Sequence, residues 1–93
     1  MSLDRGERCE DSKTIVVYEK PDCSLCEKAS AILEHLRREF DFRIEHVDIT
    51  RDRELFGRHR ERIPVLILGG QEVAWGIVTI PALRATLSCL LGK

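Results

Sequence analysis

The sequence predicts an α/β fold with the element order β-α-β-α-β-β-α, a mixed four-stranded sheet and helices on both faces. Three observations lead to this fold class. Two short apolar runs, TIVVY (14–18) and IPVLIL (63–68), have the length and β-branched content of buried strands. Two longer segments, 23–40 and 79–92, place apolar residues at helical spacing. The Gly-Gly pair that follows the second run predicts a tight hairpin turn.

The amino-terminal half predicts a strand, a helix and a second strand. TIVVY is apolar without alternation, which is typical of a central strand covered on both faces. After it the apolar period becomes helical, at Leu25, Ala29, Ile32, Leu33, Leu36 and Phe40. FRIEHVDIT (42–50) alternates imperfectly and indicates a half-exposed strand. Because a helix connects these two strands, we expect them to be parallel.

The carboxy-terminal half predicts a short helix, a hairpin and a final helix. Thr50 or Asp52 can cap the short helix, whose apolar anchors are Leu55 and Phe56. QEVAW (71–75) returns from the glycine turn as the hairpin partner of IPVLIL. The final helix is expected to begin at the N-cap Thr79 and to end at Gly92. Its apolar face comprises Ile80, Leu83, Leu87, Leu90 and Leu91.

Length and composition indicate one small domain. The chain has 93 residues and a net charge of −1, so no electrostatic attraction to nucleic acid or to an anionic membrane is expected. Residues 1–13 are dense in charge and predict a disordered tail, which leaves 14–93 as the folded domain. This segment has no apolar core of a secretory signal, so we expect a cytoplasmic location. Thiols stay reduced in that compartment, which favours a chemical role for the cysteines over a structural one. A monomer is also expected.

Two of the four cysteines stand three residues apart in KPDCSLC (20–26). A helix that begins beside Cys23 would stabilise its thiolate through unpaired main-chain N–H groups and a partial positive charge. Cys26 lies one turn deeper, where its sulfur can reach Cys23. Cys23 is therefore the expected nucleophile in disulfide exchange and Cys26 the resolving cysteine. Lys20 would add positive charge near the sulfur, and Asp22 would oppose it.

Two other interpretations of the cysteine pair are weaker. A structural zinc site takes four ligands, and the sequence offers neither a second C-x-x-C nor a histidine pair at ligand spacing, so no metal is expected. Two inert buried cysteines are the other alternative. A strand, a C-x-x-C and a helix in succession favour redox chemistry over both. Cys9 lies in the predicted tail, and Cys89 in the final helix is interpreted as a bystander thiol rather than as a site of glutathionylation or of a link between two chains.

The segment from about Thr14 to Leu91 resembles the thioredoxin-fold superfamily, and in particular the small glutaredoxin-like proteins. KPDCSLC is similar to the glutaredoxin K-x-x-C-x-x-C site, RIPVL (62–66) to the segment with the cis-proline, and VDIT (47–50) to the end of the second strand. The resemblance implies that Pro64 is cis beside the cysteines and that the backbone of Ile63 pairs with an extended substrate. It also implies substrate contacts from Lys20 and Gly76.

The sequence departs from the common glutaredoxins at two places. Ser24 and Leu25 replace the usual proline and aromatic residue between the cysteines. In AWGIVT (74–79) only Gly76 remains of the glutathione-binding pattern, and no carboxylate is present. Trp75 is interpreted as packing surface rather than as a substrate contact. The arginines at 51, 53, 58, 60 and 62 are interpreted as a solvated face.

Together these features predict a glutaredoxin-like dithiol–disulfide oxidoreductase. Its substrates would be protein or small-molecule disulfides. No bound cofactor is expected, and glutathione is a candidate reductant. The alternative is a redox-silent binding module of thioredoxin fold that holds a protein partner in the groove beside Pro64.

Overall fold

The computed structural model describes residues 13–92 and has the predicted order of elements. Residues 1–12 of the predicted tail lie outside the described part, whereas Lys13 accepts a main-chain hydrogen bond from Arg43 at 2.6 Å. The elements are β1 (Thr14–Glu19), α2 (Ser24–Leu36), β2 (Arg43–Asp48), the 3-10 turn η1 (Ile49–Arg51), α3 (Arg53–His59), β3 (Val65–Leu68), β4 (Gln71–Trp75) and α4 (Ile80–Leu91).

The four strands form one mixed sheet in the order β2-β1-β3-β4. β1 pairs in parallel with β2, and β3 is antiparallel to both β1 and β4. The predicted parallel pair and the predicted hairpin are therefore both present. β1 is central as expected, but only Ile15 and Val17 are buried, while Val16 and Tyr18 are partly exposed. The two faces of β1 are thus covered unequally.

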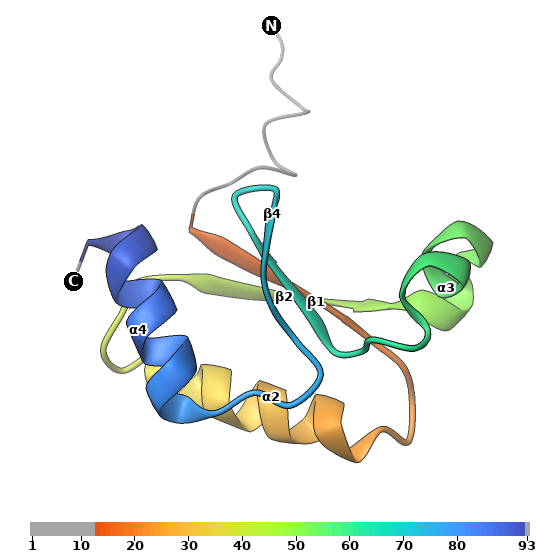
Figure 1. Cartoon of the computed structure of the whole chain (residues 1–93), viewed down its shortest axis with the longest axis horizontal. Helices are drawn as coiled ribbons and strands as arrows, with labels where there is room; N and C mark the ends of the chain where they lie inside the picture. The colour runs from red at the N-terminus through yellow and green to blue at the C-terminus, as the bar shows by residue number, and fades with distance from the viewer. Residues whose placement is uncertain (1–12, 93) are drawn as a thin grey trace, which may run out of the picture.

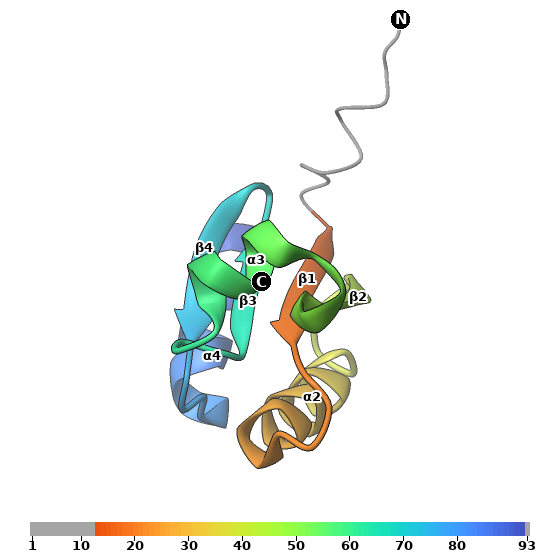
Figure 2. The ribbon, with the colours of Figure 1, turned by 90° about the vertical axis from the view of Figure 1, so that its right-hand side faces the viewer.

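Helices α2 and α4 lie together on one face of the sheet (Figures 1 and 2). The main core is the layer between them and the strands. It comprises Ile15, Val17, Ala29, Leu33, Leu36, Phe40, Phe42, Leu66, Leu68, Leu83 and Leu87. At its edge Arg84 of α4 makes two hydrogen bonds, of 2.8 and 2.6 Å, to the carboxylate of Glu39. Helix α4 is therefore tied to the segment that follows α2.

Helix α3 packs on the opposite face of the sheet, apart from the α2–α4 pair (Figure 2). Its contact with β1 is a stack of the His59 ring on Tyr18, with centroids 4.8 Å apart. Phe56, a predicted anchor, is instead 37% exposed, and His59 is buried in its place. The correction reflects geometry, because a helix of seven residues presents only one narrow stripe to the sheet. Burial is the main cause that lowers the pKa of His59.

The buried face of α2 is the predicted one except in its first turn, where Cys26 is buried in place of Leu25. Cys26, Ala29, Leu33 and Leu36 are the buried positions. Leu25 is 37% exposed, because neighbouring residues of a helix point about 100° apart and Cys26 takes the buried direction. Phe40 is buried as expected, but it lies beyond the end of the helix.

The predicted caps of α4 are both present. The Thr79 hydroxyl accepts a hydrogen bond from the Ala82 N–H at 3.4 Å. Gly92 ends the helix with a φ of 73°, a left-handed conformation that glycine adopts without steric cost. None of the helices within residues 13–92 is long and apolar enough to cross a membrane.

Candidate active site

The main chain turns sharply between β1 and α2 and places Cys23 at the start of the helix. Asp22 has a φ of 59°, which is uncommon for a residue with a side chain but is tolerated by aspartate. Cys23 is the N-cap of α2, in an extended conformation. The N–H of Cys26 donates a hydrogen bond to Cys23 Sγ at 3.2 Å. A sulfur in this position receives one of the N–H groups that a helix end leaves unpaired, an arrangement that stabilises a thiolate.

Cys26 lies one turn into the helix and is 4% exposed, while Cys23 is partly exposed. Both are free thiols. Burial is the main cause that raises the pKa of the Cys26 thiol to about 12, and the neighbouring Cys23 and the Glu19 carboxylate act in the same direction. The pair therefore combines an accessible sulfur held by a helix N-terminus with a buried sulfur that stays protonated at neutral pH.

The segment around Pro64 lies next to the cysteines. The side chain of Ile63 packs with Cys26 and Ile49 in a second, smaller core cluster, which Cys23 also touches. The Ile63–Pro64 peptide bond is cis, the isomer that the resemblance implies. Pro64 is less than 2% exposed, so its ring is covered by the protein.

Gly76 is joined to the same segment by a hydrogen bond. Its N–H donates to the Pro64 carbonyl at 2.9 Å, and its φ of 70° is one that glycine adopts readily. The structure thus places the predicted residue Ile63 against the cysteine pair and joins Gly76 to the neighbouring Pro64. Their contact with a substrate stays a prediction.

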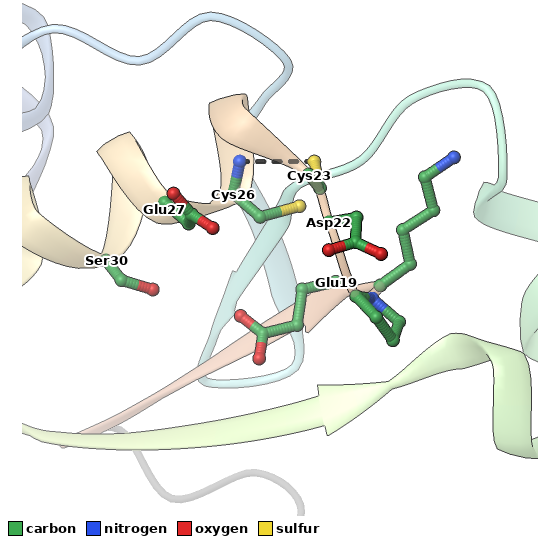
Figure 3. A pocket seen from close by; sticks show the side chains of 8 residues that line it. Glu19, Asp22, Cys23, Cys26, Glu27 and Ser30 are labelled. Carbon is green, nitrogen blue, oxygen red and sulfur yellow. Dashed lines mark hydrogen bonds between the residues drawn. The ribbon is translucent and has the colours of Figure 1, made fainter.

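A cavity of about 340 Å³ opens beside the two cysteines (Figure 3). The Pro64 segment does not line it. Figure 3 shows the Cys26 sulfur directed into this space. Lys20 and Asp22, whose opposing charges the sequence left undecided, both line it. The full lining is Glu19, Lys20, Pro21, Asp22, Cys23, Cys26, Glu27 and Ser30.

Sequence reasoning missed Glu19, Glu27 and Ser30 as site residues. Glu19 ends β1, and its Oε1 lies 3.1 Å from Nδ1 of His46 on the neighbouring strand. Glu27 and Ser30 follow Cys23 at four and seven residues, so helical spacing could have placed them on the same face as the nucleophile.

Trp75, interpreted from the sequence as packing surface, lies at the end of β4. It is 51% exposed, and the Arg62 guanidinium lies over its ring, 4.6 Å from the centroid. Arg62 also pairs with Glu72 on the same strand as Trp75. Arg58 pairs with Glu54 at 2.9 Å, which agrees with a solvated arginine face at that position.

The remaining cysteines do not join the site in the part of the chain that the structure describes. Cys89 is exposed on α4. Cys9 lies outside the described residues. Within residues 13–92 no three His, Cys, Asp or Glu side chains are grouped as a metal site would require.

The comparisons with known proteins agree with this geometry. The glutaredoxin-like domain family (DUF836) matches residues 14–88. A structural-genomics protein of X. campestris, XcR50, is 30% identical over 81% of this chain and 96% of its own, with a TM-score of 0.72. Protein Ne2328 of Nitrosomonas europaea is 24% identical over 91% of this chain and 96% of its own, with a TM-score of 0.69.

Thioredoxins share the fold at lower identity. Thioredoxin 1 of Thermosipho africanus is 18% identical over 85% of this chain and 94% of its own, with a TM-score of 0.62. A comparison with curated proteins found no match. The fold class and the family resemblance expected from the sequence are therefore confirmed.

Proposed function

The chain belongs to the glutaredoxin-like domain family (DUF836), and from this premise we propose that it is a thiol–disulfide oxidoreductase. Cys23 is the nucleophile and Cys26 the resolving cysteine. The observation that carries the proposal is the hydrogen bond from the Cys26 N–H to Cys23 Sγ at the start of α2. A protein that only binds a partner has no need of a sulfur at this position.

The reaction runs in two exchange steps. The Cys23 thiolate attacks one sulfur of a substrate disulfide, forms a mixed disulfide and releases the first substrate thiol. Cys26 then loses its proton and attacks Cys23 Sγ, which releases the second substrate thiol and leaves a Cys23–Cys26 disulfide. The substrate gains two electrons and the protein loses two. A thiol reductant, for which glutathione is a candidate, restores the two cysteines.

The proposed substrate surface lies beside the pair. The backbone of Ile63 would pair with an extended substrate next to Pro64, in the manner of an added strand. Gly76, which is hydrogen-bonded to the Pro64 carbonyl, would contact the same substrate. Lys20, which lines the cavity, would contact a polar group of the substrate. We further propose protein or small-molecule disulfides as substrates, a monomeric protein and a cytoplasmic location.

The alternative, a redox-silent binding module, has one supporting observation. Trp75 and Ile77 flank Gly76 and are 51% and 79% exposed, which is the kind of apolar surface that protein partners cover. This alternative requires no change of state at the cysteines, so a test of their chemistry separates the two functions.

Trapping the mixed disulfide tests the proposed order of events. The Cys26→Ser variant should accumulate a covalent Cys23–substrate adduct, which mass spectrometry detects. The Cys23→Ser variant should form no adduct at either position of the Cys23–Cys26 pair and should show no turnover. The matched control Cys89→Ser should turn over substrate at the rate of the unaltered protein. Full turnover by Cys23→Ser would overturn the assignment of the nucleophile.

A further inference from the structure

The cavity beside the cysteines is strongly unbalanced in charge. Three of its lining residues are carboxylates (Glu19, Asp22 and Glu27), and Lys20 is the single cation among them. Figure 3 shows the carboxylates of Glu19, Asp22 and Glu27 around the space into which the Cys26 sulfur points. The proposed function uses none of these three acids.

The fold positions two of the three acids, the side chain of Glu19 and the main chain of Asp22. The Glu19 side chain is 25% exposed, and its hydrogen bond to His46 at 3.1 Å orients the carboxylate at the end of β1. Asp22 sits in the tight turn with a φ of 59°, directly before Cys23. Glu27 follows in the first turn of α2 and stays exposed. Lys20 is exposed as well, so its flexible ammonium offsets one charge at most.

A field of this sign acts on the first exchange step. The attacking Cys23 sulfur is itself an anion, so a disulfide with carboxylates near its sulfurs is repelled by the thiolate and by the cavity. A disulfide with an ammonium group is attracted by both. Such effects reach about 10 Å at 0.1 M salt, which is the scale of this cavity. A volume of about 340 Å³ lies at the lower end of small-molecule sites, enough for a short aminoalkyl chain.

We propose that this cavity makes the protein selective for disulfides that carry a cationic group within a few bonds of the sulfurs, such as the disulfide of a small aminothiol. The inference rests on the proposed function, because it names the substrate class of the same cysteine pair. The ammonium group of the substrate disulfide would lie among Glu19, Asp22 and Glu27 while Cys23 attacks one of the substrate sulfurs. Glutathione carries two carboxylates and one ammonium, so the same field makes it a slower partner than a cationic aminothiol.

The step is an ordinary exchange. Cys23 Sγ forms a bond to one substrate sulfur as the substrate S–S bond breaks, and the departing aminothiolate takes a proton from water. Cys26 then attacks Cys23 Sγ, its proton passes to solvent, and a second aminothiolate leaves and is protonated. One cationic disulfide becomes two aminothiols, and the protein holds one disulfide, which a neutral dithiol reductant reopens.

The test measures mixed-disulfide formation at Cys23 alone. In a protein with Cys9, Cys26 and Cys89 replaced by serine, mass spectrometry follows the rate with cystamine (cationic), bis(2-hydroxyethyl) disulfide (neutral) and 3,3′-dithiodipropionate (anionic). The pocket variant adds Glu19→Gln, Asp22→Asn and Glu27→Gln. The control variant adds Glu34→Gln, Glu45→Gln and Glu61→Gln, which change the net charge equally at exposed positions outside the cavity. Dividing rate ratios between variants cancels the intrinsic reactivity of each reagent.

We expect the cationic-to-anionic rate ratio to fall about tenfold or more in the pocket variant at low salt and to change less than about twofold in the control. In 0.5 M salt the difference between the two variants should largely disappear. Equal ratios in both variants would overturn the inference. A further arm compares peptide disulfides flanked by Lys with those flanked by Glu. A preference for the Lys peptides as large as that for cystamine would indicate that the cationic substrates are proteins. No such preference would indicate that they are small aminothiols.

The readout separates this inference from the proposed function. Adduct formation at Cys23 needs neither Cys26 nor a reductant. If Cys23 forms adducts selectively but the unaltered protein shows no turnover, the charge selectivity stands and the proposed oxidoreductase activity is rejected. Turnover without a charge preference would retain the oxidoreductase and reject the selectivity.

Discussion

Cys23 serves the fold as well as the proposed chemistry, and two substitutions separate these roles. Its sulfur is the N-cap acceptor for the Cys26 N–H at 3.2 Å, at the start of a helix of 13 residues. Cys23→Ser keeps an acceptor at this position, whereas Cys23→Ala leaves the N–H without its side-chain partner. Both variants remove the thiol, so neither should form a mixed disulfide, but their stabilities should differ.

The expected difference follows from the capping geometry. Loss of an N-cap acceptor typically costs about 0.5–2 kcal/mol, so Cys23→Ser should exceed Cys23→Ala in free energy of unfolding by about 1 kcal/mol. For a domain of this size that is about 4–8 °C in Tm. The exposed Cys89 within α4 provides a control of opposite sign. There alanine should exceed serine by up to about 0.5 kcal/mol, because alanine has the higher helix propensity.

Urea and thermal unfolding of the four variants under reducing conditions measures both differences. The slope of the urea transition should be unchanged, so that the midpoint reports stability alone. The reasoning would be refuted if alanine and serine were equally stable at Cys23, or if serine were favoured at Cys89 as well.

Three further predictions concern packing, pH and the turn before α4. Leu33→Ala should lower the free energy of unfolding in urea by about 2–5 kcal/mol, because Leu33 is 0% exposed in the core. Leu25→Ala in the same helix should lower it by less than about 1 kcal/mol. Equal losses at the two positions would contradict the observed helix face. Starting from a preformed mixed disulfide at Cys23, the rate of attack by Cys26 should rise about tenfold per pH unit from pH 7 to 9, because only the thiolate attacks and burial raises the pKa of Cys26. Stopped-flow measurement of that rate would contradict this account if it levelled off below pH 8. Gly76→Ala should lower the free energy of unfolding by about 1–2 kcal/mol through its φ of 70° alone, since no atom lies within 4 Å of the added Cβ, and Gly76→Asn should recover part of the loss in the same urea assay.

The parts of the fold that the sequence predicts correctly depend on neighbours in the chain. TIVVY predicts a central strand from five residues, and Thr79 and Gly92 mark the ends of α4 because caps act within one turn. The position of Cys23 at a helix start follows in the same way. Each of these predictions needs no knowledge of what the segment packs against.

The errors come from contacts between distant segments. Leu25 and Cys26 are both apolar enough for the core, and only the sheet beneath α2 decides that Cys26 is buried. His59 replaces Phe56 as the buried residue of α3 because Tyr18, 41 positions earlier, offers a flat ring to stack on. The charged cavity was missed for a different reason. Its lining lies within residues 19–30, but the place of Glu19 and Asp22 beside the sulfurs depends on the turn between β1 and α2, in which Asp22 adopts a φ of 59°.

The central claim is that Cys23 and Cys26 form a reversible redox pair, and equilibration in glutathione buffers of graded ratio tests it most directly. After acid quenching and alkylation, mass spectrometry measures the fraction of protein with both thiols free. We predict a single two-electron transition at these two residues, with a midpoint between about −270 and −200 mV, the range spanned by thioredoxin and the glutaredoxins. Two thiols that stay reduced across the whole series would contradict the account.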